Sequence, residues 1–269
     1  VGCDDATVPT DAGVPTTDAP SVDAPSVDVP SVDLPGIDVP SADVPGSTCE
    51  GAVVSRPGST SELVDGADRA TVTMDDPAAC VRTYQLRTTA ALRDGQPANP
   101  RTVRERDGWP TLRSGHDLFD SLYALAIEEM RENSVAAIRD GSFNSGNPID
   151  CPAGGCFETG RLWNYVWTRD TAYAAHLSLA SMDPLRTRNS LAFKLSARRG
   201  GSNPQIVQDT GTGGSYPVSS DRVVWSLGAS ELLKHLTGAD RASFLELAYP
   251  AMVNTAEHDR RVVFDARDG

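Results

Sequence analysis

An aromatic cluster followed by a paired cation and carboxylate is the feature of this sequence with the clearest chemical meaning. The stretch WNYVWTRDTAYAAH, residues 163–176, places Trp167, Arg169 and Asp170 within four positions. Aromatic rings stack on the C–H faces of sugars, while Arg donates and Asp accepts hydrogen bonds with adjacent hydroxyl groups. This spacing favours a saccharide-binding site at the start of a helix, whose dipole would keep Asp170 ionised.

Two segments resemble a known enzyme family. Residues 165–171, YVWTRDT, resemble the motif of glucoamylases and related six-hairpin, (α/α)6-barrel glycosidases. Residues 213–225, GGSYPVSSDRVVW, also resemble these toroids, in which a glycine-rich loop leads into another inner helix. The resemblance implies a mainly α fold, in which residues 111–269 form part of an (α/α)6 toroid of helical hairpins.

The resemblance also implies roles for individual residues. Trp167 would stack on the sugar at the non-reducing end, and Arg169 and Asp170 would bind its hydroxyl groups. Asp221 and Arg222 are further candidates for the cleft. The expected partner is a poly- or oligosaccharide, acted on without a metal or an organic cofactor.

Simpler interpretations of these side chains stay open. An acid in a first helical turn is ordinary capping, so Asp170 could serve the helix alone, and Arg222 could pair with an acid nearby. Trp163 and Tyr165 fit a cleft wall or a core equally well. His176 lies on the following helix and fits packing better than catalysis.

The catalytic activity implied by the resemblance is inverting hydrolysis of α-linked glucans. Such enzymes use two carboxyl groups about 6.5–9.5 Å apart, one as the acid and one to activate water. In the family both lie further along than this chain reaches, so we expect an N-terminal fragment that binds substrate and is inactive alone. Glu158 is the one loop glutamate near the expected cleft and a weak candidate acid. The alternative is a non-catalytic surface carbohydrate-binding or scaffold lipoprotein.

Helices are expected to position these residues. Residues 117–139 carry apolar side chains at three- and four-residue steps, which predicts a long amphipathic helix with that face in the core. The face comprises Phe119, Leu122, Tyr123, Ala126, Ile127, Met130, Ser134, Ala137 and Ile138. Capping residues and proline predict further helices over about 168–181, 184–198, 220–237 and 239–261. Long connections at 140–167 and 199–218 alternate with short ones, as in stacked helical hairpins.

The segment before these helices divides into two parts. Residues 1–48 contain a proline at every fifth position from Pro15 to Pro45 in units such as SVDVP, which predicts a disordered acidic tether. Residues 49–110 contain strand-like runs at 70–74 and 81–89, which predict a small, partly β lead-in domain.

The cysteines predict a location outside the cytoplasm. A small residue before Cys3, followed at once by the acidic tether, resembles the cleavage site of a bacterial lipoprotein, with Cys3 as the lipidated residue. The other four suggest Cys49–Cys80 and Cys151–Cys156 disulfides. Zinc is the competing use of four cysteines, but the spacing lacks a second close pair and no histidine is near. We therefore expect an extracytoplasmic, lipid-anchored protein.

Charge and motif content argue against other functional classes. Residues 1–50 carry nine Asp and one Glu with no basic residue, so the remainder has a net charge of only −3, from 24 basic and 27 acidic side chains. A nucleic-acid-binding protein would need a concentrated basic face. No apolar run approaches the roughly 18 residues of a membrane span, which leaves only a lipid anchor for membrane contact. Phosphate-loop and GxSxG motifs do not occur.

Overall fold

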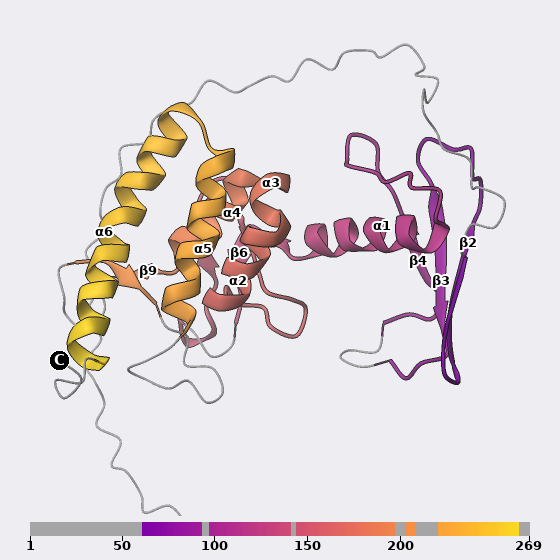
Figure 1. Ribbon diagram of the computed structural model, residues 1–269, viewed down its shortest axis with the longest axis horizontal. Coiled ribbons are helices and arrows are strands. Elements are labelled where there is room, and N and C mark those ends of the chain that lie inside the picture. Colours follow the sequence, from indigo (N-terminus) through magenta and orange to yellow (C-terminus); the bar gives the residue numbers. More distant parts are fainter. Residues whose placement is uncertain (1–60, 93–96, 141–143, 197–202, 208–219, 264–269) are drawn as a thin grey trace, which may run out of the picture. The chain divides into compact units, whose positions relative to one another are not determined.

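The computed structural model describes residues 61–92, 97–140, 144–196, 203–207 and 220–263 (Figure 1). Within these segments the chain forms a four-stranded antiparallel sheet, small two-stranded hairpins and five helices. No helix there is long and apolar enough to cross a membrane. The expected tether 1–48, Cys3 and Cys49 lie outside the described residues.

The four-stranded sheet is a meander. Its strands follow the chain in the order β1 (Glu62–Asp65), β2 (Asp68–Met74), β3 (Thr83–Thr88) and β4 (Arg101–Arg104). Two of these strands confirm the runs expected at 70–74 and 81–89, and β1 and β4 add an edge on each side. Alternation places Val72, Tyr84 and Val103 on the buried face. Gly66, with φ of 60°, allows the tight turn between β1 and β2.

The N-terminal half of helix α1 (Asp117–Glu132) packs on this face of the sheet. Its residues Leu118 and Ala124 pack with Val72, Tyr84 and Val103 in one hydrophobic cluster. The prediction of which face of this helix is buried was wrong, because Phe119 and Leu122 are 57% and 48% exposed. The helix also ends before residue 139, because the next residues pair as short strands.

A buried ion network ties α1 to the sheet. Arg113 donates two hydrogen bonds to the Glu105 carboxylate, at 2.6 and 2.5 Å, and the Tyr84 hydroxyl donates a third at 3.2 Å. Burial, followed by the charge of Glu105, raises the pKa of Tyr84 to about 12. Asp120 of α1 lies 3.7 Å from the Arg82 guanidinium. Two cations therefore balance two anions where the helix meets the strands.

Short strands fill the region where a long helical connection was expected. They are β5 (Ser134–Val135), β6 (Ala137–Ile138), β7 (Ile149–Asp150) and β8 (Cys156–Phe157), with η1 (Asn144–Gly146) between β6 and β7. β5 pairs with β8 and β6 with β7. Later, β9 (Leu195–Ser196) pairs with β10 (Gln205–Ile206).

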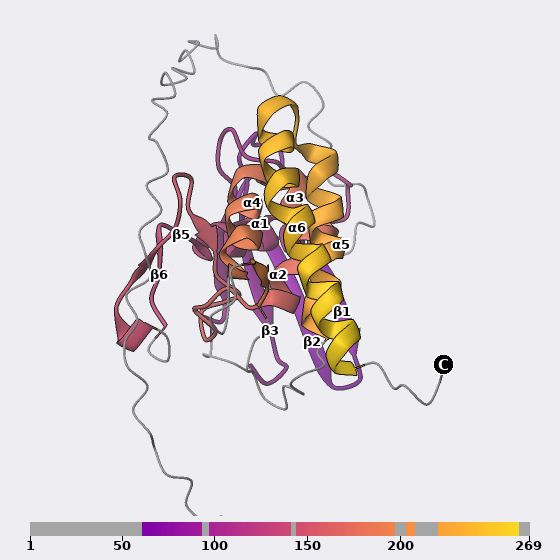
Figure 2. The same ribbon diagram turned by 90° about the vertical axis from the view of Figure 1, so that its left-hand side faces the viewer.

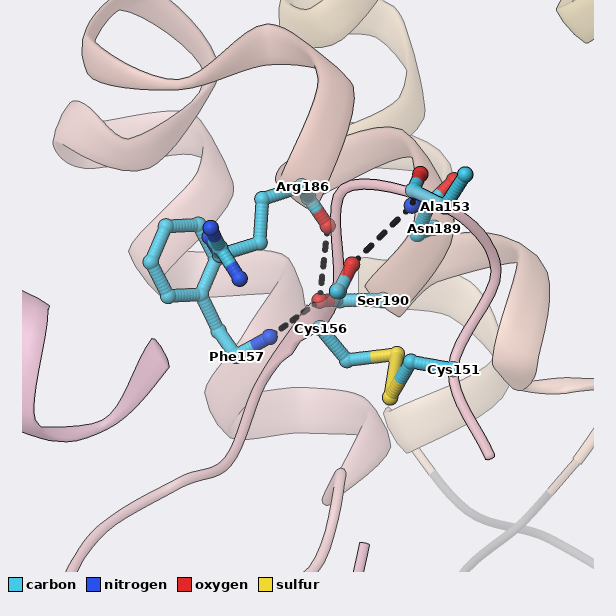
Figure 3. The surroundings of a disulfide bond; sticks show 8 residues. Cys151, Ala153, Cys156, Phe157, Arg186, Asn189 and Ser190 are labelled. Atoms are coloured by element: carbon cyan, nitrogen blue, oxygen red, sulfur yellow. Dashed lines mark hydrogen bonds between the residues drawn. A yellow bond between two sulfur atoms is a disulfide. The ribbon is translucent and has the colours of Figure 1, made fainter. Parts of the chain in front are cut away.

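The predicted Cys151–Cys156 disulfide is present and its loop is fastened to a helix (Figure 3). Asn189 donates hydrogen bonds to the Ala153 and Gly155 carbonyl oxygens at 3.0 and 2.9 Å. The backbone N–H of Phe157 donates to Ser190, whose hydroxyl in turn donates to the Arg186 carbonyl. Cys80 is a disulfide cysteine, but Cys49 is not described, so the Cys49–Cys80 pairing stays a prediction.

The remaining helices pack around a central helix, α5. They are the continuous run α2 (Thr168–Ala174), η2 (Ala175–Leu179) and α3 (Ala180–Met182), then α4 (Pro184–Phe193), α5 (Ser220–His235) and α6 (Gly238–Val263). Asp183 caps α4 by accepting a hydrogen bond from the Arg186 N–H at 3.0 Å, as the Asp-Pro pair predicts. Trp225 of α5 is fully buried beside Phe244 of α6, and its indole N–H donates to the Leu191 carbonyl.

The prediction of a partial (α/α)6 toroid is therefore wrong: the fold is mixed α and β. In a toroid each helical hairpin packs against the next in a ring. Here α1 is buried against a β-sheet, and α5 contacts α2, α4 and α6 together (Figures 1 and 2). The alternation of long and short connections did not predict this mixed fold. The residues between the helices form short paired strands, and the length of a connection does not show whether it contains strands.

Candidate functional site

The aromatic cluster before α2 is partly anchored and partly open to solvent. Trp167, the N-cap residue of α2, makes edge-to-face contacts with Trp163 and Tyr165, at centroid distances of 6.1 and 5.8 Å. Tyr165 contacts Phe193, and the buried Lys194 ammonium lies 4.6 Å from the Tyr165 ring centroid. Trp163 is 58% exposed. Trp163 is thus the aromatic side chain presented to solvent, and Tyr165 belongs to the packed side.

Arg169 and Asp170 point to different neighbours of α2. The Nε atom of Arg169 lies 3.0 Å from an oxygen of Asp221 on α5, in a pair whose Arg is exposed and whose Asp is buried. Asp170 instead lines a cavity toward α1, and neither Trp167 nor Arg169 is among the residues that line it. The structure therefore brings Arg169 and Asp221 together and leaves Asp170 apart from them.

Arg222 holds together the junction of α5, β10 and α6. Its buried guanidinium donates to Asp259 at 2.6 Å, to the Gln205 side chain at 2.7 Å and to the Ile206 carbonyl at 3.2 Å. Arg222 therefore pairs with a nearby acid, Asp259, which is the simpler of the interpretations that the sequence left open. His176 packs near Glu231 of α5, with 3.6 Å between the two side chains.

A polar groove lies next to the loop that carries Trp163, although Trp163 itself is not among its lining residues. It has a volume of about 740 Å³ and is lined by Glu132, Asn133, Val135, Ala136, Ala137, Arg139, Glu158, Arg161 and Asn164. The Asn164 amide donates to the Arg139 carbonyl at 2.8 Å, and Gly160 and Trp163 exchange backbone hydrogen bonds across a tight turn. Trp163 therefore sits in a fixed loop between two lining residues, Arg161 and Asn164. Sequence reasoning missed this groove, although the composition of RLWNYVW could have suggested it.

A second hollow separates α1 from the α2–η2–α3 run. This α1–α2 cavity has a volume of about 430 Å³ and is lined mainly by apolar side chains. Its lining comprises Tyr123, Ala126, Ile127, Met130, Asn133, Phe157, Glu158, Thr159, Asp170, Thr171, Ala174, Ser178, Leu179 and Met182. Burial raises the pKa of Glu158 above its ordinary range. Glu158 and Asn133 line both this cavity and the polar groove.

Comparisons of the chain with protein-family models, with curated proteins and with solved structures found no match.

Proposed function

We propose that this protein binds oligosaccharides in the polar groove, with Trp163 as the stacking platform. The observation that carries the proposal is the set of side chains on one groove: two guanidinium groups, two carboxylates and two amides, with the exposed Trp163 between the groove residues Arg161 and Asn164 in the chain. These are the planar groups that bridge neighbouring sugar hydroxyls, and the indole supplies an apolar face.

The local packing supports binding because the platform is already in place. Trp163 and Trp167 meet edge to face, and the turn from Gly160 fixes the Trp163 backbone. A ring that is immobilised before binding loses little conformational freedom when a sugar stacks on it. The groove also contains both signs of charge, which suits neutral hydroxyl-rich ligands better than a strongly charged polymer.

We take α-linked glucans as the ligand class from the resemblance of residues 165–171 to a glucan-binding motif; these residues follow the groove residue Asn164 in the chain and do not line the groove themselves. The Cys151–Cys156 disulfide supports an oxidising, extracytoplasmic location. Anchoring to a bacterial membrane through Cys3 is part of the same proposal.

Calorimetric titration with maltoheptaose tests the binding. Trp163→Ala is expected to weaken affinity about tenfold, equivalent to about 1.4 kcal/mol. Trp109→Ala is the matched control, because Trp109 is also partly exposed but contacts Arg131 elsewhere on the surface. Absence of binding by the parent protein at millimolar maltoheptaose, or equal losses in the two variants, would refute the proposal.

Glycoside hydrolysis in the same groove is the second candidate function. Glu132 and Glu158 both line the groove, and the raised pKa of Glu158 is what a general acid needs. Glu158 would protonate the leaving glycosidic oxygen while Glu132 removes a proton from the attacking water. Release of reducing ends from maltooligosaccharides, abolished in Glu158→Gln, is the expected result. A parent protein that binds glucan but releases no reducing ends would limit the function to binding.

A further inference from the structure

We propose that the α1–α2 cavity is a second binding site, which shares Glu158 and Asn133 with the polar groove, for a small amphiphilic amine: an aromatic or branched aliphatic body that carries one protonated amino group. This inference goes beyond saccharide binding and does not depend on it.

The walls of the cavity select the apolar body of the ligand. Helix α1 has two apolar faces, of which one packs on the sheet through Leu118 and Ala124. The other face contributes Ile127 and Met130 to the cavity, opposite Met182 of α3. The volume of about 430 Å³ falls within the range of about 300–1,000 Å³ typical of small-molecule sites. Methionine adapts readily to aromatic and aliphatic guests.

The negative charges that line the cavity favour a ligand with a protonated amino group. Glu158 and Asp170 are the charged residues that line it, and within the described segments no basic residue does. Neither carboxylate has an ion pair or a side-chain hydrogen bond among the described residues, whereas Arg169, next to Asp170 in the chain, is paired with Asp221. Half-buried Glu158 is disfavoured as an anion by burial alone, and a protonated amine would supply the missing partner. An anionic ligand would meet two negative charges.

The π-helical turn η2 shapes the side of the cavity that faces α1. Ser178 and Leu179 of η2 line the cavity, together with Ala174 before the turn and Met182 after it. Because a π turn takes up about one residue more than an α turn, it brings Met182 back toward the side occupied by Ala174. Such turns are rare inside helices and frequent at functional sites. Here the turn adds the side chain of Met182 to the cavity lining.

Three probes with one ring system test both halves of the proposal. They are 2-(2-naphthyl)ethylamine, 2-(2-naphthyl)ethanol and 2-naphthylacetate, titrated calorimetrically into the full chain at pH 7. The amine is expected to bind at least tenfold more tightly than the alcohol, since it alone forms charge-assisted hydrogen bonds, and the acetate more weakly than both. Equal affinity of the amine and the alcohol, or no binding of either, would overturn the proposal.

Two variants locate the binding. Asp170→Asn should weaken amine binding about tenfold and leave alcohol binding within twofold, while Glu246→Gln, an exposed carboxylate on α6, should change neither. Ala126→Phe fills the cavity from a position that is itself exposed, so it needs no repacking and should abolish binding of both probes. Its maltoheptaose affinity should be unchanged, which separates this site from the polar groove. Amine affinity that survives Ala126→Phe places the site elsewhere and contradicts the inference.

Discussion

Replacement of Arg222 by glutamine is expected to destabilise the fold strongly, because the arginine holds α6 and β10 to α5. The side chain is 5% exposed and its partner Asp259 is 25% exposed, with 2.6 Å between the paired atoms. Removal of one partner from a buried ion pair costs about 3–5 kcal/mol, and water can reach Asp259, so we expect about 3 kcal/mol. At about 2–4 °C per kcal/mol, the melting temperature should fall by about 6–12 °C.

Urea unfolding followed by circular dichroism measures this free energy. Arg260→Gln, next to Asp259 on α6, is the matched control: its pair with Glu257 spans 3.0 Å but is exposed on both sides, so the loss should stay below about 0.5 kcal/mol. The double variant with Asp259→Asn should lose less than the sum of the two single losses. An Arg222→Gln protein that unfolds within about 0.5 kcal/mol of the parent would refute this role of the guanidinium. Retained stability with lost glucan affinity would instead support the cleft role suggested by the sequence.

Two further predictions concern packing and pH. Gly228→Ala places a Cβ 2.9 Å from the Ala172 backbone where α5 crosses α2. It should lower the free energy of unfolding, measured in urea, by about 1–3 kcal/mol. Gly160→Ala is the control, because its Cβ meets nothing within 4 Å. Burial raises the pKa of Glu158 in the folded protein above that in the unfolded chain. The contribution of Glu158 to the free energy of unfolding is therefore largest below the ordinary glutamate pKa of about 4.3, and it is lost as the pH rises through the raised pKa. Glu158→Gln should therefore melt above the parent at pH 7 and together with it below about pH 4, and a difference that persists at low pH would contradict this reasoning.

Local features of the fold could be predicted from the sequence because they depend on neighbouring residues. Asp183-Pro184 starts α4 where expected, since the cap and the first turn are made within four residues. The strand-like runs became β2 and β3, and the close Cys151–Cys156 pair forms a disulfide. The burial of α1 could not be read in the same way, because both of its apolar faces satisfy a helical period and only the sheet decides which is covered.

For the site residues, too, the sequence predicted positions along the chain, whereas their contacts depend on the tertiary structure. The sequence by itself determined that Trp167, Arg169 and Asp170 lie at the start of α2, because they are close in the chain: Trp167 is the residue that caps the helix, and the other two follow it. Only the tertiary structure decided their partners: Arg169 faces Asp221 on α5, whereas Asp170 faces α1 across the cavity. Consecutive helical residues point about 100° apart, so each meets a different neighbour, and which neighbour stands there depends on packing between segments distant in the chain.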